Sequence, residues 1–284
     1  MAENSDFDKR AEEGSILFNQ LLQSAIEKAG LTQVQKDQWN DLENRFGNLE
    51  ISEFPKERPK PYQDEDFSKL DKLTKSDYIW LPQPKSKYTF YHPKLEKDGI
   101  PVAKQNKYYN QNWFDAHSSL QQEGLTMLTI KEFIDFLNTL KTDAHDLSGN
   151  KIPESERLEI YNEITQKKNP WRAEWLDSDF KVVNGILHIN SNHRKTNGNL
   201  IPQVSEPLED CVMQDCWVDL NLSNKQGLPT QKTRRQETYF WYPKRNNNSV
   251  ARFFADTYGA VLSCYWNPSY IDAALAVRPS AKNF

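Results

Sequence analysis

The chain has 284 residues, enough for one large domain or for a domain of about 150–200 residues with an added piece. Its 36 Lys and Arg stand against 40 Asp and Glu. The resulting net charge of -4 argues against a general nucleic-acid binder, since such domains are usually basic. Hydrophobic residues make up only 37%, but eight Trp residues can build a core from fewer apolar positions.

The amino terminus has no apolar core that could serve as a signal peptide, and no run approaches the ~18 apolar residues of a membrane span. We therefore expect no membrane insertion. The location stays unknown, with a cell or virion surface reached by another route left open. Cys211, Cys216 and Cys264 do not make a disulfide framework, which favours folding in a reducing compartment.

Residues 1–53 are predicted to form a helical hairpin. Its first helix ends at Gly30, and its second begins at Thr32 as N-cap. The hairpin could pack on the main domain or on a second copy of the chain, so an oligomer stays open. Residues 54–74 are rich in proline and charge and indicate a linker.

Residues 75–284 combine helix and strand patterns, which predicts a single α+β domain. Thr129 and Glu132 have the spacing of a capping box and predict the start of a helix. Asn184 and Gly185 form a two-residue turn signal between apolar runs and predict a hairpin. Helices are expected at residues 113–124, 130–140 and 153–166, strands at 78–81, 88–91, 180–183, 186–189, 217–220, 239–242 and 260–265, and loops at 190–203 and 221–236.

The carboxyl-terminal stretch from residue 249 to 279 alternates two kinds of residue, and its segment 260–265 has the period-two spacing of a strand. The residues expected to form a buried frame are Val250, Phe253, Ala255, Leu262, Cys264, Pro268, Ala274, Leu275 and Val277. The residues between them, expected on the outward surface, are Phe254, Asp256, Thr257, Tyr258, Gly259, Val261, Ser263, Tyr265, Trp266, Tyr270, Ile271 and Asp272. An ordinary strand and loop is the alternative explanation.

The residue usage of this stretch is unusual. Between Val250 and Ser280 there is no Lys, Glu, Gln or Met, although the chain uses the first three freely elsewhere. Every residue of the outward set except Trp266 can be reached from an asparagine codon by changing only its adenines. Trp266 would need an arginine or lysine codon as its source.

These features resemble the diversity-generating retroelement variable proteins, and the pattern SVARF-x-A…L-x-C-x-x-NPS…AAL-x-VRP is similar to their archaeal, nanoarchaeal-type branch. The helix pair WFDAHSSLQQEGLTMLTIKEFIDFL and the segment EWLD add to the resemblance. It implies a C-type lectin-like fold with mixed and antiparallel sheets and two main helices. It also implies a variable region at about residues 250–280, in which the twelve outward residues bind an unknown protein or cell-surface ligand noncovalently.

The sequence predicts no metal site and no cofactor. None of the five histidines has the spacing of a zinc motif, and the segment 177–179 lacks the glycine and distal glutamate of a calcium loop. The calcium-binding signatures of sugar-binding C-type lectins are also missing, because Trp266 and Asn267 are followed by Pro268.

We expect a binding protein and not an enzyme. There is no nucleophile elbow and no cluster of groups able to tune one another's pKa, and the paired-cysteine motif of formylglycine-generating enzymes is absent. A formylglycine-type or other enzyme on the same fold, or a structural virion or surface protein, stays as the alternative. Arg252 and Arg278 occupy frame positions and are expected to support loops, since a guanidinium can bind carbonyls or a carboxylate.

Overall fold

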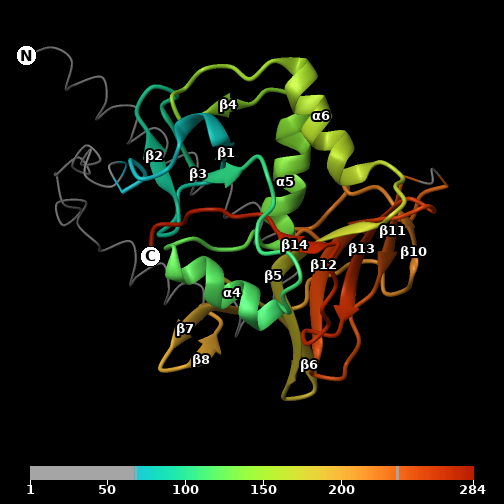
Figure 1. Cartoon of the computed structure of the whole chain (residues 1–284). Helices are drawn as coiled ribbons and strands as arrows, with labels where there is room; N and C mark the ends of the chain where they lie inside the picture. The colour runs from blue at the N-terminus through green and yellow to red at the C-terminus, as the bar shows by residue number, and fades with distance from the viewer. Residues whose placement is uncertain (1–66, 68, 235–236) are drawn as a thin grey trace, which may run out of the picture. The chain divides into compact units, whose positions relative to one another are not determined.

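The computed structural model of the chain describes residue 67 and residues 69–234 and 237–284. The predicted amino-terminal hairpin, residues 1–53, lies outside the described residues. The described part is a mixed α+β structure with three α-helices and two larger sheets (Figure 1). None of the described helices combines the length and apolarity needed to cross a membrane.

The first sheet has four strands in the order β2-β3-β1-β4. Both predicted strands of this region exist, but each pairs with β3, which the pattern missed. Gly99 and Pro101 lie within β3, and both residue types count against a strand in sequence. The strands are β1 (Tyr78–Pro82), β2 (Phe90–His92), β3 (Lys97–Ala103) and β4 (His145–Asp146).

The second sheet has eight strands. Seven lie in the order β10-β11-β13-β12-β5-β6-β9, and β14 pairs with β5. The pairs β11–β13 and β14–β5 are parallel and the others antiparallel, so the sheet is mixed as expected. The strands are β5 (Arg172–Val183), β6 (Ile186–Ser191), β9 (Val204–Pro207), β10 (Cys216–Val218), β11 (Thr238–Trp241), β12 (Ser249–Ala255), β13 (Ala260–Trp266) and β14 (Leu275–Val277).

The predicted hairpin at Asn184-Gly185 is confirmed, because it joins β5 to β6 with positive φ angles of 51° and 81°. The loop predicted at 190–203 is wrong in part, since it contains the hairpin of β7 (Arg194–Thr196) and β8 (Asn199–Ile201). Asn197 and Gly198 form its turn with the same signs of φ. The sequence contains this turn signal, but the strands beside it are short, polar and largely exposed, so they lack the apolar alternation that predicts a strand.

The three helices begin and end close to their predicted positions. α5 starts with the full capping box of Thr129 and Glu132, and the Asn112 side chain caps α4. Gly124, with a φ of +71°, follows the end of α4. The helices are α4 (Trp113–Gln122), α5 (Ile130–Lys141) and α6 (Glu154–Thr165).

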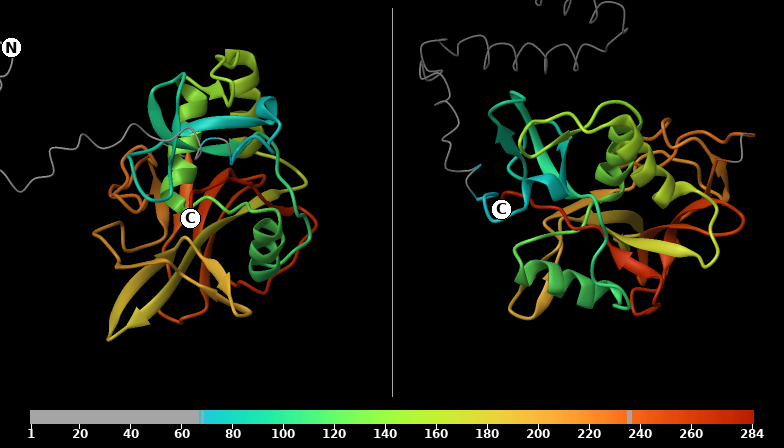
Figure 2. Two further views of the ribbon diagram at one scale, coloured as in Figure 1. Left: turned by 90° about the vertical axis from the view of Figure 1, so that its left-hand side faces the viewer. Right: turned by 45° about the horizontal axis from the view of Figure 1, so that its top comes forward.

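α5 packs against one face of the large sheet and α4 against the other (Figure 2). One core cluster joins β1 and α5 to Phe253 and Leu262 of the sheet. The other joins α4 and residues around Trp80 to Val261 and Phe254. Leu70, which falls within the predicted linker 54–74, is buried in this second cluster, so the end of that linker packs against the domain. The strands of the carboxyl-terminal stretch therefore have packed neighbours on both faces.

Candidate functional site

Strand register brings four side chains into one row across the large sheet. Trp241 of β11 lies opposite Ser263 of β13, Ser263 lies opposite Arg252 of β12, and Arg252 lies opposite Trp175 of β5. Residues in register point to the same face of a sheet. The neighbouring row on that face contains Tyr239, Val261, Phe254 and Ala173. This is the face opposite α5.

Half-buried aromatic rings gather on this face of the sheet. We call them the aromatic face: Trp217, Tyr239, Trp241, Tyr265, Trp266 and Tyr270. The Trp241 ring is stacked with those of Tyr265 and Trp266, with centroids 5.1 and 5.9 Å apart, and Tyr270 meets Trp266 edge-on at 5.5 Å. Trp217 meets Tyr239 edge-on at 5.1 Å. Their partial exposure leaves ring surface available to a ligand.

The structure divides the twelve predicted site residues into three groups by exposure. The exposed residues are Thr257, Tyr258 (80%) and Ile271 (51%). The half-buried residues are Asp256, Tyr265, Trp266, Tyr270 and Asp272. The buried residues are Phe254, Gly259, Val261 and Ser263. The expected exposure is wrong for this last group, because both faces of β12 and β13 are covered near these positions.

The exposed positions do not form one patch by themselves. Thr257 and Tyr258 lie in the turn before β13, whereas Tyr265 and Trp266 end it, and seven strand residues span about 20 Å. Aromatic residues of β10 and β11, which lie outside the predicted variable region, bridge this interval. A Cβ added to Gly259 in the turn would lie 4.0 Å from Trp217, which places Trp217 beside the turn.

Two predicted site residues, Asp256 and Asp272, stabilise the loops that contain them through hydrogen bonds to the backbone. Oδ1 of Asp256 accepts hydrogen bonds from the backbone N–H groups of Tyr258 (2.7 Å) and Gly259 (3.2 Å). Oδ1 of Asp272 accepts from the Ala274 N–H at 2.8 Å, and its Oδ2 accepts from the Tyr270 hydroxyl at 3.1 Å. Such carboxylate-held turns are locally stabilising, so these two positions combine a surface location with a structural task.

Arg252 lies beneath the aromatic face and is 3% exposed. Its guanidinium carbon is 3.2 Å from the centroid of Trp266 and 4.6 Å from that of Phe254, with Trp171 and Tyr270 at 4.9 and 5.8 Å. Burial lowers its pKa to about 9, so the group is charged at neutral pH. Its Nε and Nη1 atoms have no hydrogen-bond partner among the described residues, and neither does Ser263 Oγ in the same row.

Arg278 supports loops in the predicted way, whereas Arg252 is buried as expected but its Nε and Nη1 atoms bind no carbonyl or carboxylate among the described residues. It donates to both carboxylate oxygens of Glu174, at 2.6 and 3.1 Å, and to the backbone carbonyls of Ala103 and Lys104. Both ends of the ion pair are buried, with side chains 5% and 7% exposed. The frame prediction is also confirmed for its buried members, although Ala274 is only half-buried.

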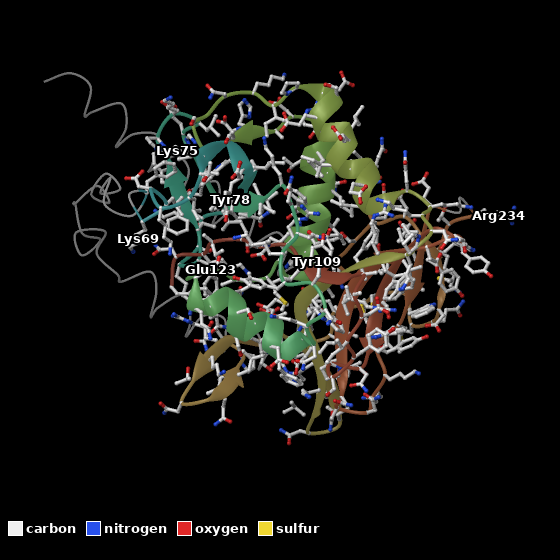
Figure 3. All side chains as sticks on the ribbon, viewed as in Figure 1. Lys69, Lys75, Tyr78, Tyr109, Glu123 and Arg234 are labelled. Atoms are coloured by element: carbon white, nitrogen blue, oxygen red, sulfur yellow. The ribbon has the colours of Figure 1, made fainter. Side chains whose placement is uncertain are left out.

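Sequence reasoning missed the part of the aromatic face that comes from other strands. Trp217, Tyr239 and Trp241 were assigned to strands without a surface role. The available signal was the period-two alternation of β11. Thr238 and Phe240 are buried, whereas Tyr239 and Trp241 between and after them are half-buried. Arg234, in the loop before β11, is labelled at the right-hand side of Figure 3.

A second cluster of chemically active groups lies away from this face. His117 of α4, Asp177 of β5 and His193 are buried, and their ligand-type atoms lie within 4.8 Å of one another. Burial lowers the pKa of His117 to about 4. Burial opposes charge on His193 as well, but the Asp177 carboxylate outweighs it and raises the pKa of His193 to about 9. Spacing in sequence could not reveal this cluster, because its members are at least 16 residues apart along the chain.

Comparison of the chain with protein-family models, with curated proteins and with solved structures finds no match.

Proposed function

We propose that the chain is a ligand-binding protein whose carboxyl-terminal surface is diversified by a retroelement, on a C-type lectin-like fold. The ligand is a protein or cell-surface molecule, bound noncovalently through the aromatic face and the adjacent turn. Aromatic side chains favour such recognition because they offer a large contact area at small conformational cost and a polar tip for hydrogen bonds.

The observation that carries the proposal is the contrast within residues 250–280. Frame residues such as Leu262 and Leu275 are at most 1% exposed, whereas Tyr258 and Ile271 between them are 80% and 51% exposed. Exchange of exposed residues costs little stability, usually within about 0.5 kcal/mol, whereas a change of one methylene is felt in a core. A surface intended to vary requires this separation.

The structure narrows the set of residues that we assign to the variable surface. Its best candidates are Thr257, Tyr258, Tyr265, Tyr270 and Ile271. At positions 256 and 272 only side chains that can accept the same backbone hydrogen bonds would keep the loops folded. Phe254, Gly259, Val261 and Ser263 are buried and would vary only at a cost in stability. Gly259 has a φ of +142°, a conformation that other residues rarely adopt.

Trp266 fits the frame better than the variable set. Its ring contacts the buried Arg252 and is stacked with Trp241, which lies outside residues 250–280, and its Nε1 atom is buried. The residue is also the one that an asparagine codon cannot produce by adenine changes. Two independent properties, one of the codon and one of the packing, thus agree in assigning Trp266 to the scaffold.

The genomic test is the DNA around the gene. The proposal expects a near-repeat of the 3′ coding end beside a reverse transcriptase gene, differing at adenines of the codons for the variable residues and matching at the codon of Trp266. A gene without such a repeat would remove the main support for retroelement diversification.

The protein test uses asparagine, the residue that the source codons encode. The triple variant Thr257→Asn, Tyr258→Asn and Ile271→Asn should fold with a melting temperature within a few degrees of the wild type. The matched control is Phe254→Asn, which puts an amide into the core and should unfold the protein or lower its melting temperature strongly. Equal effects of the two variants would contradict the separation of frame and surface.

A further inference from the structure

We propose that His117, Asp177 and His193 form a binding site for a divalent first-row transition-metal ion such as zinc. The three residues come from α4, from β5 and from the segment that follows β6, so the site exists only in the folded chain. Two imidazole nitrogens and one carboxylate oxygen are ligands that zinc and its neighbours accept, whereas calcium and magnesium prefer oxygen alone.

The distances place three potential ligand atoms around a common point. Asp177 Oδ1 lies 2.5 Å from His193 Nδ1 and 3.6 Å from His117 Nε2. Ligand atoms of a tetrahedral ion with bonds near 2.0–2.1 Å lie roughly 3.3 Å apart. A small outward shift of the His193 ring would therefore admit the ion, which would take the place of the proton that His193 Nδ1 donates to Asp177 and release this proton to solvent.

The second observation is the lack of hydrogen-bond partners at His117. The residue is 1% exposed, yet neither of its ring nitrogens has a partner among the described residues. A buried polar atom without a partner is costly, and such atoms call for an explanation. A metal ion bound to Nε2 would satisfy this nitrogen and would connect α4 to the sheet.

The surroundings orient the proposed ligands. The Trp113 ring meets the rings of both histidines edge-on, at 4.4 and 5.0 Å, and its own Nε1 donates to the Leu176 carbonyl. On the other side of the His193 ring, Nε2 lies 3.5 Å from Asp179 Oδ1. A carboxylate at the second nitrogen of a ligating histidine is the common arrangement at metal sites, because it fixes the tautomer and the orientation of the ring.

One residue of the cluster, His193, borders a neighbouring cleft, whereas His117 and Asp177 do not line it. His193 is among the residues that line a cleft of about 750 Å³, together with Gln121 and Lys282. Lys69, labelled in Figure 3, also lines it. The chain offers three ligands and no fourth at comparable distance among the described residues, so a water molecule would complete the coordination.

The test is metal binding by the full, untagged chain after treatment with a chelator. Isothermal titration with zinc chloride should give one ion per chain, and cobalt should give the visible absorption of a low-symmetry site. The metal should also raise the melting temperature by several degrees, because it binds the folded state and not the unfolded one. All five histidines lie within the described residues, so the candidates for the ligands are few.

Variants separate this site from adventitious binding. His117→Gln and His193→Gln should each weaken zinc binding more than about 100-fold, since changes even outside the ligand set weaken it 10- to 100-fold. His188→Gln, on the same strand pair but half-exposed, and the double variant Cys211→Ser and Cys216→Ser should bind as the wild type does. Circular dichroism checks that each variant is folded.

The proposal would be overturned by a folded wild type that takes up no stoichiometric zinc or cobalt. Binding that survives both histidine variants, or that is lost in the cysteine variant, would overturn it as well. If a histidine variant does not fold, the cobalt spectrum of the wild type still decides, because thiolate ligands give an intense ultraviolet charge-transfer band that nitrogen and oxygen ligands do not.

Discussion

Two buried arginines of the large sheet have opposite surroundings. Arg278 is bound by the Glu174 carboxylate and by two backbone carbonyls, so its donors have fixed polar partners. Arg252 lies among aromatic rings, and two of its nitrogens have no hydrogen-bond partner among the described residues. Both arginines are at most 4% exposed, so exposure alone does not distinguish them.

The two arginines differ in how strictly their contacts fix the position of the guanidinium group. Hydrogen bonds to a carboxylate and carbonyls require one geometry, which suits the joint between β14, β5 and the loop after β3. A guanidinium attracted to ring faces tolerates a range of positions, because this attraction depends mainly on closeness to the ring centre. Arg252 can therefore support the rings of the aromatic face in more than one arrangement, as the proposed function requires.

The largest loss of stability is expected when Glu174, the carboxylate partner of Arg278, is replaced. Glu174→Ala leaves a buried charge without its counterion and should lower the free energy of unfolding by about 3–5 kcal/mol. Urea denaturation measures it. Glu163→Ala is the control, because Glu163 is 60% exposed and binds Lys168 at the surface, where ion pairs contribute about 0–1 kcal/mol. Similar losses for the two variants would contradict the structural role of Arg278.

The second-largest loss of stability is expected when a buried side chain of the frame is truncated. Leu262→Ala and Leu275→Ala should each cost about 2–5 kcal/mol, since both leucines are at most 1% exposed and a cavity would remain. Leu158→Ala serves as the matched control, because Leu158 on α6 is 37% exposed. Chemical denaturation with a loss below about 1 kcal/mol at Leu262 would show that the register of β13 is wrong.

A smaller loss is expected at the ring above Arg252. Trp266→Ala should lower the free energy of unfolding by about 1–3 kcal/mol, because it removes half-buried ring surface and the shortest of the four cation–π contacts described for Arg252. Trp266→Phe keeps a ring face and should restore most of the stability. Thermal and urea unfolding of the two variants test this. If alanine proved neutral, Trp266 would return to the variable set.

The smallest effect is expected at the exposed positions. Tyr258→Ala and Ile271→Ala should change the free energy of unfolding by no more than about 0.5 kcal/mol, since most of each side chain is in solvent. Both should nevertheless weaken binding once a ligand is known, because aromatic and large apolar anchors often dominate an interface. Destabilisation by more than about 1 kcal/mol would contradict the exposed position of these two side chains.

Much of the local structure could be predicted from the sequence. The capping box at Thr129, the turn at Asn184-Gly185 and the apolar periodicity of α5 act over a few residues, so their physical cause lies within the segment itself. The buried frame was predicted for the same reason, because alternation along one strand identifies two sets of residues. The sequence by itself thus determined the three helices, the turn at Asn184-Gly185 and strands such as β1, β6, β11 and β13, but not β3, β12 and β14.

Only the tertiary structure decided which strand faces are covered and which distant residues meet. Alternation in β13 could not reveal that Val261 and Ser263 are buried, because their neighbours in the same rows come from β11 and β12. The aromatic face depends on the parallel pairing of β11 with β13, and the cluster of His117, Asp177 and His193 depends on the packing of α4 on β5. Such contacts join residues far apart along the chain, and their geometry is set by strand order and helix packing, which no local pattern records.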